Sequence, residues 1–477
     1  RKGLISAICK GRNKIQMRKD KMENFEILPT EENLIKTLEA DLLGRNQQLS
    51  YFYNLLLAQK GASTIAVDGK WGSGKTFFIK QSTMVINAKK PVSIIEKEKR
   101  EKILSKLFLT ESDNYDDCNL AIYYDAWEND NDTDPIVSLV YEIAKQLGMT
   151  YTFDPDTDFF KLGGAVLDVF SGKNLKGIIE NLKSDNPLSK FKEQKALEEK
   201  LKDFFSEALN ERGNRLVVFI DELDRCKPSF TVRLLEQIKH YMHDERITYV
   251  LSINTEELQH TIKNYYGDSF DACRYLDRFF YLRINLPPVD KKKFYMNIEL
   301  NGRYYLEIIS RRIIDVYNMQ LREITRFYRQ VRTAAYVPTH DDEKWNCIFP
   351  DGEARQFMLS CIVPIIIGLK MVDISMYEQF ISGKSGKPMV DILNTKEFST
   401  GLLCRFLKED ESFSQIEKKK LITPEEKILE IYNAIFVNKY SGNDYQKTIG
   451  KCEFDADSRK FVLVAASMLS QYANYEI

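Results

Sequence analysis

One stretch of eight residues constrains this sequence most, because Gly69–Thr76 reads G-x-x-x-x-G-K-T. A short apolar run at residues 64–68 precedes it, and residues 77–81 after it can open a helix. Glycine permits backbone angles and close approaches that a side chain would block. The backbone N–H groups of such a loop and the positive end of the helix dipole point at one place. The pattern therefore predicts a phosphate-binding loop between a strand and a helix.

This loop predicts a nucleotide site with Mg²⁺. Lys75 would reach the β- and γ-phosphates, and the hydroxyl of Thr76 would bind the metal ion. A glycine-rich turn with a chance lysine is the alternative, but the strand before the loop and the helix after it favour the nucleotide site. The other predicted contacts to the nucleotide come from the loop and its surroundings: Gly69, Trp71, Gly72, Ser73, Gly74 and Phe77.

Arg45 is a further candidate for nucleotide contact. Residues 31–60 carry apolar positions at helical spacing in two runs, which Gly44 and Arg45 separate. A turn just upstream of the first strand could cover the adenine. Arg45 could stack there or could be a solvated loop arginine, and the sequence leaves both interpretations open.

Three more strand candidates alternate with helical patterns downstream. Apolar runs at residues 120–124, 215–220 and 247–253 are typical of strands, and the last two are continuous enough to be buried on both faces of a parallel sheet. An amphipathic helix is expected after Pro135, and another from about Ser229. This alternation predicts an α/β fold whose nucleotide lies at the carboxyl ends of the strands.

Two acids follow the strand at residues 215–220 directly. Asp221 suits the carboxylate associated with Mg²⁺, and Glu222 suits the residue that activates the attacking water. The alternative is that adjacent acids merely cap the next helix. Because a phosphate loop precedes them, the catalytic interpretation is favoured.

Five other polar side chains are weaker candidates. Asn254 ends the neighbouring strand, where it could contact the γ-phosphate or simply start a helix. Arg278 and Arg322 could bring positive charge to the γ-phosphate, although most helical arginines are solvated or ion-paired. His240 and His243 could share a metal ion, but no third ligand is visible, which favours a surface pair.

The proline pair Pro287–Pro288 marks a change in the pattern. Before it we expect a basic disordered tail (1–30) and a nucleotide-binding core (31–288) with a polar helical insertion at 150–212. After it, a C-terminal all-helical domain (289–477) is expected. Its strongest helical patterns cover 291–316, 321–336, 354–371 and 424–438.

The composition bears on the partners and the cellular location of the chain. A net charge of −1 over 477 residues gives no global attraction to nucleic acid, so such binding would need a local patch, for which residues 291–293 are the nearest candidate. The eight cysteines form no C-x-x-C pair, which favours a reducing, cytoplasmic location. No run of 18 apolar residues occurs, so no transmembrane segment is expected.

Several motifs together resemble the KAP family of P-loop NTPases. They are the phosphate loop, the Tyr124–Glu128 element with its tryptophan, the D-E-L-D-R sequence at 221–225, and Tyr275–Arg278 leading to the proline pair. The resemblance spans roughly residues 40–335 and includes a helix-borne arginine like Arg322. It implies a sheet of order 5-1-4-3-2, and it places Asp224 and Arg225 in or beside the site. It also suggests a role in bacterial defence against phage or plasmids, which the residues themselves do not show.

These observations predict a Mg²⁺-dependent ATPase whose hydrolysis switches conformation or assembly. The C-terminal helices would carry contacts to further copies of the chain or to a partner protein. Two alternatives remain: a nucleotide-dependent interaction scaffold with little turnover, and a nucleic-acid-processing motor subunit. In the family context Trp127 could be a core anchor or a wall beside the γ-phosphate, and its aromatic bulk favours the anchor.

Overall fold

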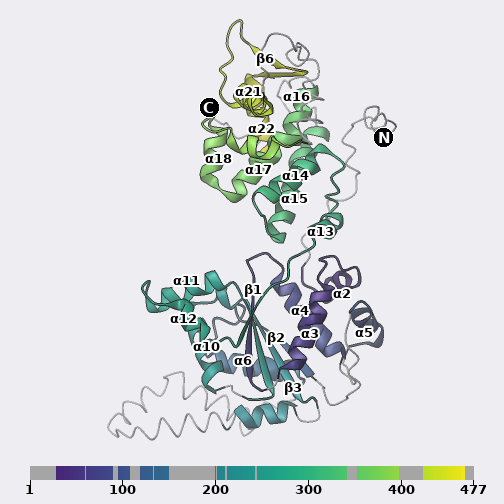
Figure 1. Cartoon of the computed structure of the whole chain (residues 1–477), viewed down its shortest axis with the longest axis vertical. Helices are drawn as coiled ribbons and strands as arrows, with labels where there is room; N and C mark the ends of the chain where they lie inside the picture. Colours follow the sequence, from purple (N-terminus) through teal and green to yellow (C-terminus); the bar gives the residue numbers. More distant parts are fainter. Residues whose placement is uncertain are drawn as a thin grey trace. The chain divides into compact units, whose positions relative to one another are not determined.

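The computed structural model describes residues 28–59, 61–89, 95–107, 119–132, 134–149, 199, 201–209, 212–241, 244–340, 352–396 and 423–467. Most of the predicted tail, most of the predicted insertion and His243 lie outside these ranges. The described residues form two compact units, one from Leu28 to Phe294 and one from Tyr295 onward (Figure 1).

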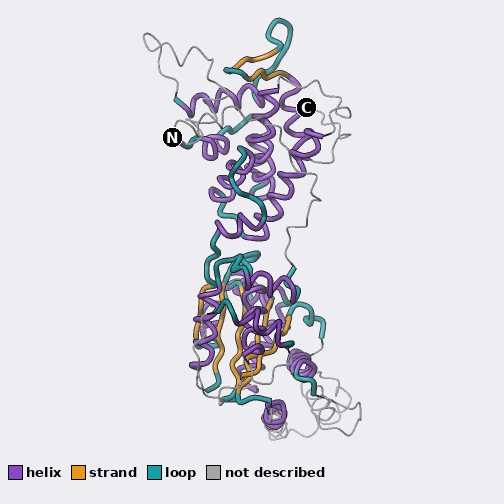
Figure 2. Tube along the Cα trace, turned by 90° about the vertical axis from the view of Figure 1, so that its right-hand side faces the viewer, coloured by secondary structure: helices purple, strands orange, loops and turns teal. Residues whose placement is uncertain are grey.

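A five-stranded parallel sheet forms the centre of the first unit (Figure 2). Its spatial order is β2-β3-β4-β1-β5, which confirms the order 5-1-4-3-2 implied by the family resemblance. The fifth strand was not located from the sequence, and it comes directly before the Leu286-Pro287-Pro288 segment. The strands are β1 (Ser63–Asp68), β2 (Asn119–Asp125), β3 (Arg215–Asp221), β4 (Ile247–Ile253) and β5 (Leu282–Asn285).

Alternation along the strands builds two apolar cores, one on each face of the sheet. On β3, Leu216 and Ile220 face one core, whereas Val217 and Phe219 face the other. Each such side chain stabilises the fold by about 1.5–3 kcal/mol when it is fully buried. Because both faces are covered, β3 and β4 read as nearly continuous apolar runs, as expected for a parallel sheet.

Helices cover both faces of this sheet (Figure 1). α2, α3, α4 and α5 pack on one side, and α6, α10, α11 and α12 pack on the other. α6 begins at Pro135, as predicted, and Asp134 caps it by accepting from Ile136 N. The bounds are α2 (Glu31–Glu39), α3 (Asn46–Ala58), α4 (Lys75–Lys89), α5 (Lys97–Leu104), α6 (Pro135–Gln146), α10 (Pro228–Tyr241), α11 (Thr255–Tyr266) and α12 (Ala272–Asp277).

The second unit is mainly helical, as predicted. The division between the units falls inside α13 (Lys291–Asn297). The further helices are α14 (Tyr305–Val316), α15 (Leu321–His340), α16 (Gly352–Phe357), α17 (Val363–Val372), α18 (Ile374–Ile381), α19 (Lys387–Leu393), α21 (Pro424–Phe436) and α22 (Ala456–Ser467).

Three details of this unit correct the sequence predictions. The single helix expected at 291–316 is broken, because Glu299 and Gly302 adopt positive φ angles between α13 and α14. The pattern at 354–371 contains a π-helical turn at 358–362, just before Pro364, which cannot donate a helical hydrogen bond. The region is not all-helical, since β6 (Gln446–Ile449) and β7 (Cys452–Asp455) form an antiparallel hairpin.

One continuous helical segment among the described residues, Gly352–Val372, is long and apolar enough to cross a membrane by length and composition. Of its most apolar 18-residue window, 72% is buried inside the protein. A helix in the core of a globular unit has the same character.

Candidate nucleotide site

The phosphate loop connects β1 to α4, as predicted. Gly72 and Gly74 have φ angles of 77° and 88°, in the left-handed region that glycine tolerates. Gly69 is packed closely, because a Cβ atom there would lie 3.1 Å from both Leu286 Cβ and Ser73 Oγ. The loop therefore depends on its glycines for both conformation and space.

Lys75 lies at the first position of α4 and is buried. Its Nζ donates to the carbonyl of Gly69 at 2.6 Å and lies 3.4 Å from that of Lys70. Burial lowers the pKa of Lys75, and the nearby Asp224 and Asp221 oppose that shift. The ammonium group is thus held within the loop, where an anion would meet it.

The two predicted acids lie at the end of β3, beside the phosphate loop. Asp221 is fully buried and accepts hydrogen bonds from Tyr123 Oη at 3.2 Å and from the N–H of Glu222 at 3.0 Å. Thr76 Oγ1 lies 3.4 Å from Glu222 Oε1. The structure therefore brings the adjacent residues Lys75 and Thr76 together with the adjacent acids Asp221 and Glu222, and the two pairs are far apart in sequence.

Glu222 is held in a strained and charged setting. Its φ angle is 59°, in the left-handed region that non-glycine residues seldom adopt, and such outliers gather at functional sites. Burial raises the pKa of its carboxyl, the neighbouring Asp221 raises it further, and Arg225 opposes the shift. Arg225 Nε lies 2.7 Å from Glu222 Oε2, so this ion pair keeps the carboxylate in place.

Two partly exposed tryptophans flank Arg225. The Arg225 guanidinium lies 5.6 Å from the Trp71 ring and 5.5 Å from the Trp127 ring. Trp71 Nε1 also donates to Asp224 Oδ2 at 2.5 Å. Asp224 and Arg225 therefore do belong to the network beside the site.

Trp127 corrects the expectation of a buried anchor, because 52% of its surface is exposed. The turn that carries it is tied down by backbone groups instead. Asp125 Oδ1 accepts from the N–H groups of Trp127 and Glu128 at 3.1 Å each, and Ala126 N donates to the carbonyl of Asp221 at 3.0 Å. The ring is thereby available to contact Arg225.

Arg45 contacts the phosphate loop. It is 5% exposed, so the solvated alternative is wrong. Its Nη2 donates to the carbonyl of Ser73 at 3.1 Å, whereas Nε and Nη1 have no hydrogen-bond partner among the described residues. Burial lowers the pKa of Arg45 to about 10. Buried N–H groups without a partner beside this loop fit an anionic ligand.

The remaining candidates lie in different places. Asn254 is buried at the carboxyl end of β4, at the same edge of the sheet as the phosphate loop. Arg278 instead lines a small cavity with Ser63 and Thr64, at the amino end of β1. Within one chain it is therefore distant from the loop, and a role at the γ-phosphate would need a second copy. Arg322 belongs to the second unit.

Tyr123 was not predicted as part of the site. The sequence feature that could have indicated it is its position two residues before Asp125, on the strand beside β3.

No group of three or more metal-ligating His, Cys, Asp or Glu side chains occurs in the described ranges. The predicted metal contacts, Thr76 and Asp221, would complete their coordination with phosphate and water oxygens instead.

Comparison with known proteins gives one family match. The model of the KAP family P-loop domain matches residues 45–337. A comparison with curated proteins found no match. The structure of the Aeropyrum pernix Orc1 protein in complex with DNA covers 94% of both chains at 14% identity, with a TM-score of 0.29, which is too low to support an inference.

Proposed function

This chain belongs to the KAP family of P-loop NTPases, and on that premise we propose that it binds ATP with Mg²⁺ and hydrolyses it. The observation that carries the proposal is the meeting of buried Lys75 with Asp221 and Glu222 at the mouth of the phosphate loop. Nucleotide binding follows from the family, whereas hydrolysis requires the acid pair as well.

Each residue has a stated role in this reaction. The loop N–H groups and Lys75 would bind the phosphates, and Arg45 would supply further N–H donors. Thr76 and Asp221 are the residues that would hold Mg²⁺, which neutralises charge on the phosphates. Glu222 would accept a proton from the attacking water, whose oxygen bonds to the γ-phosphorus as ADP leaves.

The decisive experiment replaces Glu222 by glutamine. Glu222→Gln should lower ATP turnover by about 10²–10⁴-fold, because the amide cannot accept the proton. Binding of a fluorescent ATP analogue at the phosphate loop should persist in this variant, whereas Lys75→Ala should lose the nucleotide bound at that loop. Glu256→Gln makes the same charge change on an exposed residue of α11 and should turn over normally. Wild-type turnover in Glu222→Gln would reject the proposal.

The Glu222–Arg225 ion pair favours a second candidate, a nucleotide-dependent scaffold with slow turnover. In this reading Arg225 holds the carboxylate away from water until a partner releases it. Tight ATP binding with turnover near background, rising in Arg225→Ala, would support the scaffold over the freely cycling ATPase.

The purpose of the cycle is also a proposal. Hydrolysis would switch conformation or assembly through the C-terminal unit, in a cytoplasmic protein, and the family resemblance motivates a role in antiphage or plasmid defence. Measuring the mass of the particle with and without ATP tests the assembly step. An unchanged mass in both conditions would reject nucleotide-driven assembly.

A further inference from the structure

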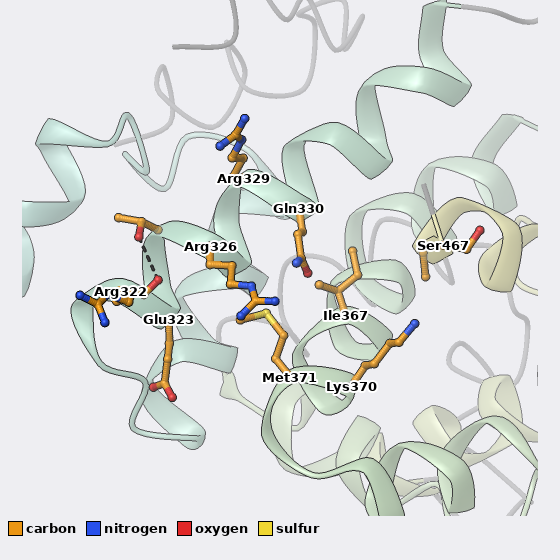
Figure 3. A pocket seen from close by; sticks show the side chains of 11 residues that line it. Arg322, Glu323, Arg326, Arg329, Gln330, Ile367, Lys370, Met371 and Ser467 are labelled. Atoms are coloured by element: carbon orange, nitrogen blue, oxygen red, sulfur yellow. Dashed lines mark hydrogen bonds between the residues drawn. The ribbon is translucent and has the colours of Figure 1, made fainter. Parts of the chain in front are cut away.

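A second concentration of positive charge lies in the C-terminal unit, around a cavity of about 770 Å³ (Figure 3). α15, α17 and α22 form its walls. Its basic side chains are Arg322, Arg326, Arg329 and Lys370. The site described above does not include this cavity, which belongs to the other compact unit.

Three of the four basic side chains share one face of α15. Arg322, Arg326 and Arg329 are spaced at i, i+4 and i+7, which places them on the same side of the helix. The opposite face carries Phe327 and Val331, both fully buried in the core of the unit. The core therefore fixes the orientation of α15, and that orientation places the three arginines among the residues that line the cavity.

Two of the four cations, Arg326 and Lys370, carry charge that no described carboxylate pairs. The carboxylate among the described lining residues, that of Glu323, accepts from the N–H of Gln320 at 2.7 Å and so is engaged at the start of α15. In the described part of the chain no carboxylate lies within ion-pair distance of Arg326 or Lys370. Lys370 Nζ lies 5.9 Å from the centre of the Tyr377 ring.

The cavity also has an apolar wall. Ile367 and Met371, one turn apart on α17, and Ala466 on α22 line it together with the cations. In Figure 3, Arg326 extends from α15 toward Met371, and Lys370 projects from the facing helix. A ligand that combines negative charge with a flat or apolar part matches this lining.

We propose that this cavity binds a small phosphorylated molecule of nucleotide size. Its volume lies within the range of about 300–1,000 Å³ that is typical of small-molecule sites. Arginine forks suit phosphate oxygens, and the apolar wall suits a ring. A nucleic-acid backbone would instead need an extended basic track with stacking aromatic side chains. The site is separate from ATP hydrolysis and does not require it.

The test uses the full chain carrying Lys75→Ala, which disables the phosphate loop. This chain should still bind one mant-ATP, a fluorescent ATP analogue, and inorganic pyrophosphate should displace it. Adding Arg326→Ala and Lys370→Ala should weaken that binding about tenfold or more. Arg312→Ala and Lys384→Ala remove the same charges from exposed positions in the same unit and should leave the affinity unchanged.

Three results would overturn the proposal. One is the absence of mant-ATP binding to the Lys75→Ala chain. Another is an effect of the cavity variants only when Lys75 is intact, which would place these side chains on the nucleotide of the phosphate loop. The third is loss of binding to a short single-stranded oligonucleotide without any change for mant-ATP, which would assign the face to nucleic acid.

Discussion

The phosphate-loop site and the basic cavity both gather positive charge, but they hold it differently. Lys75 and Arg45 are buried and donate to carbonyl groups of the loop, and carboxylates lie near Lys75. Arg322, Arg326 and Lys370 are exposed on helix faces. A buried charge acts through a low dielectric and a prepared geometry, whereas an exposed one is screened by solvent and salt. The buried charges of the phosphate loop therefore favour a ligand of one geometry, whereas the exposed charges of the cavity attract anions with less regard to their geometry.

The largest expected change in stability comes from breaking a buried ion pair of the first unit. Arg233 Nη2 lies 2.8 Å from Asp134 Oδ2, whose side chain is fully buried. Arg233→Ala should lower the unfolding free energy by about 1–3 kcal/mol, because the carboxylate stays buried with less compensation. Arg332→Ala, whose partner Glu299 is 70% exposed, should cost less than about 1 kcal/mol.

The same variant predicts a pH dependence. Burial raises the pKa of Asp134 in the folded protein, and Arg233 opposes this. A carboxyl whose folded pKa is above its unfolded value costs stability as the pH rises through that range. The deficit of Arg233→Ala should therefore be largest at neutral pH and should shrink once Asp134 is protonated. Chemical denaturation across the pH range measures it, and a pH-independent deficit would contradict the assignment.

The next effect concerns the backbone of the loop. Gly74→Ala places a side chain at a φ angle of 88°, which costs about 1–2 kcal/mol. The affinity for ATP should fall about tenfold through the misplaced N–H groups. Gly352→Ala, in a helix with open space around the position, should leave the affinity unchanged. Titration with the fluorescent ATP analogue compares the two variants, and equal affinities would show that the loop is not prepared in advance.

The salt dependence of ligand binding should differ between the two sites. Raising the ionic strength shortens the screening length, and this weakens exposed charges more than buried ones. Ligand binding at the cavity should therefore fall several-fold more than binding at the phosphate loop. Parallel titrations of Lys75→Ala and of the cavity variant measure the two slopes. Equal slopes would break the distinction between buried and exposed charge.

The smallest effect should come from Trp127. Because the ring is half exposed, Trp127→Ala should lower stability by less than about 1 kcal/mol, the worth of an exposed cation–π contact. A buried anchor would cost about 3–5 kcal/mol. Thermal unfolding distinguishes the two values, and a large loss would restore the anchor interpretation.

The sequence by itself determined the features that depend on local pattern. The glycine loop, the apolar strands and the acids at the end of β3 are each encoded within a few residues, so residue type and spacing sufficed to predict them. The strand order was implied by the family resemblance, and the observed pairing of the strands has the same order.

Only the tertiary structure decided which side chains from distant segments contact one another. Trp71 and Asp224 are 153 positions apart, and no local pattern connects them. The burial of Arg45, the exposure of Trp127 and the basic face of α15 likewise depend on which elements pack together. A local sequence encodes the conformation of its own backbone, whereas the partners of a side chain are chosen by the packing of the whole chain.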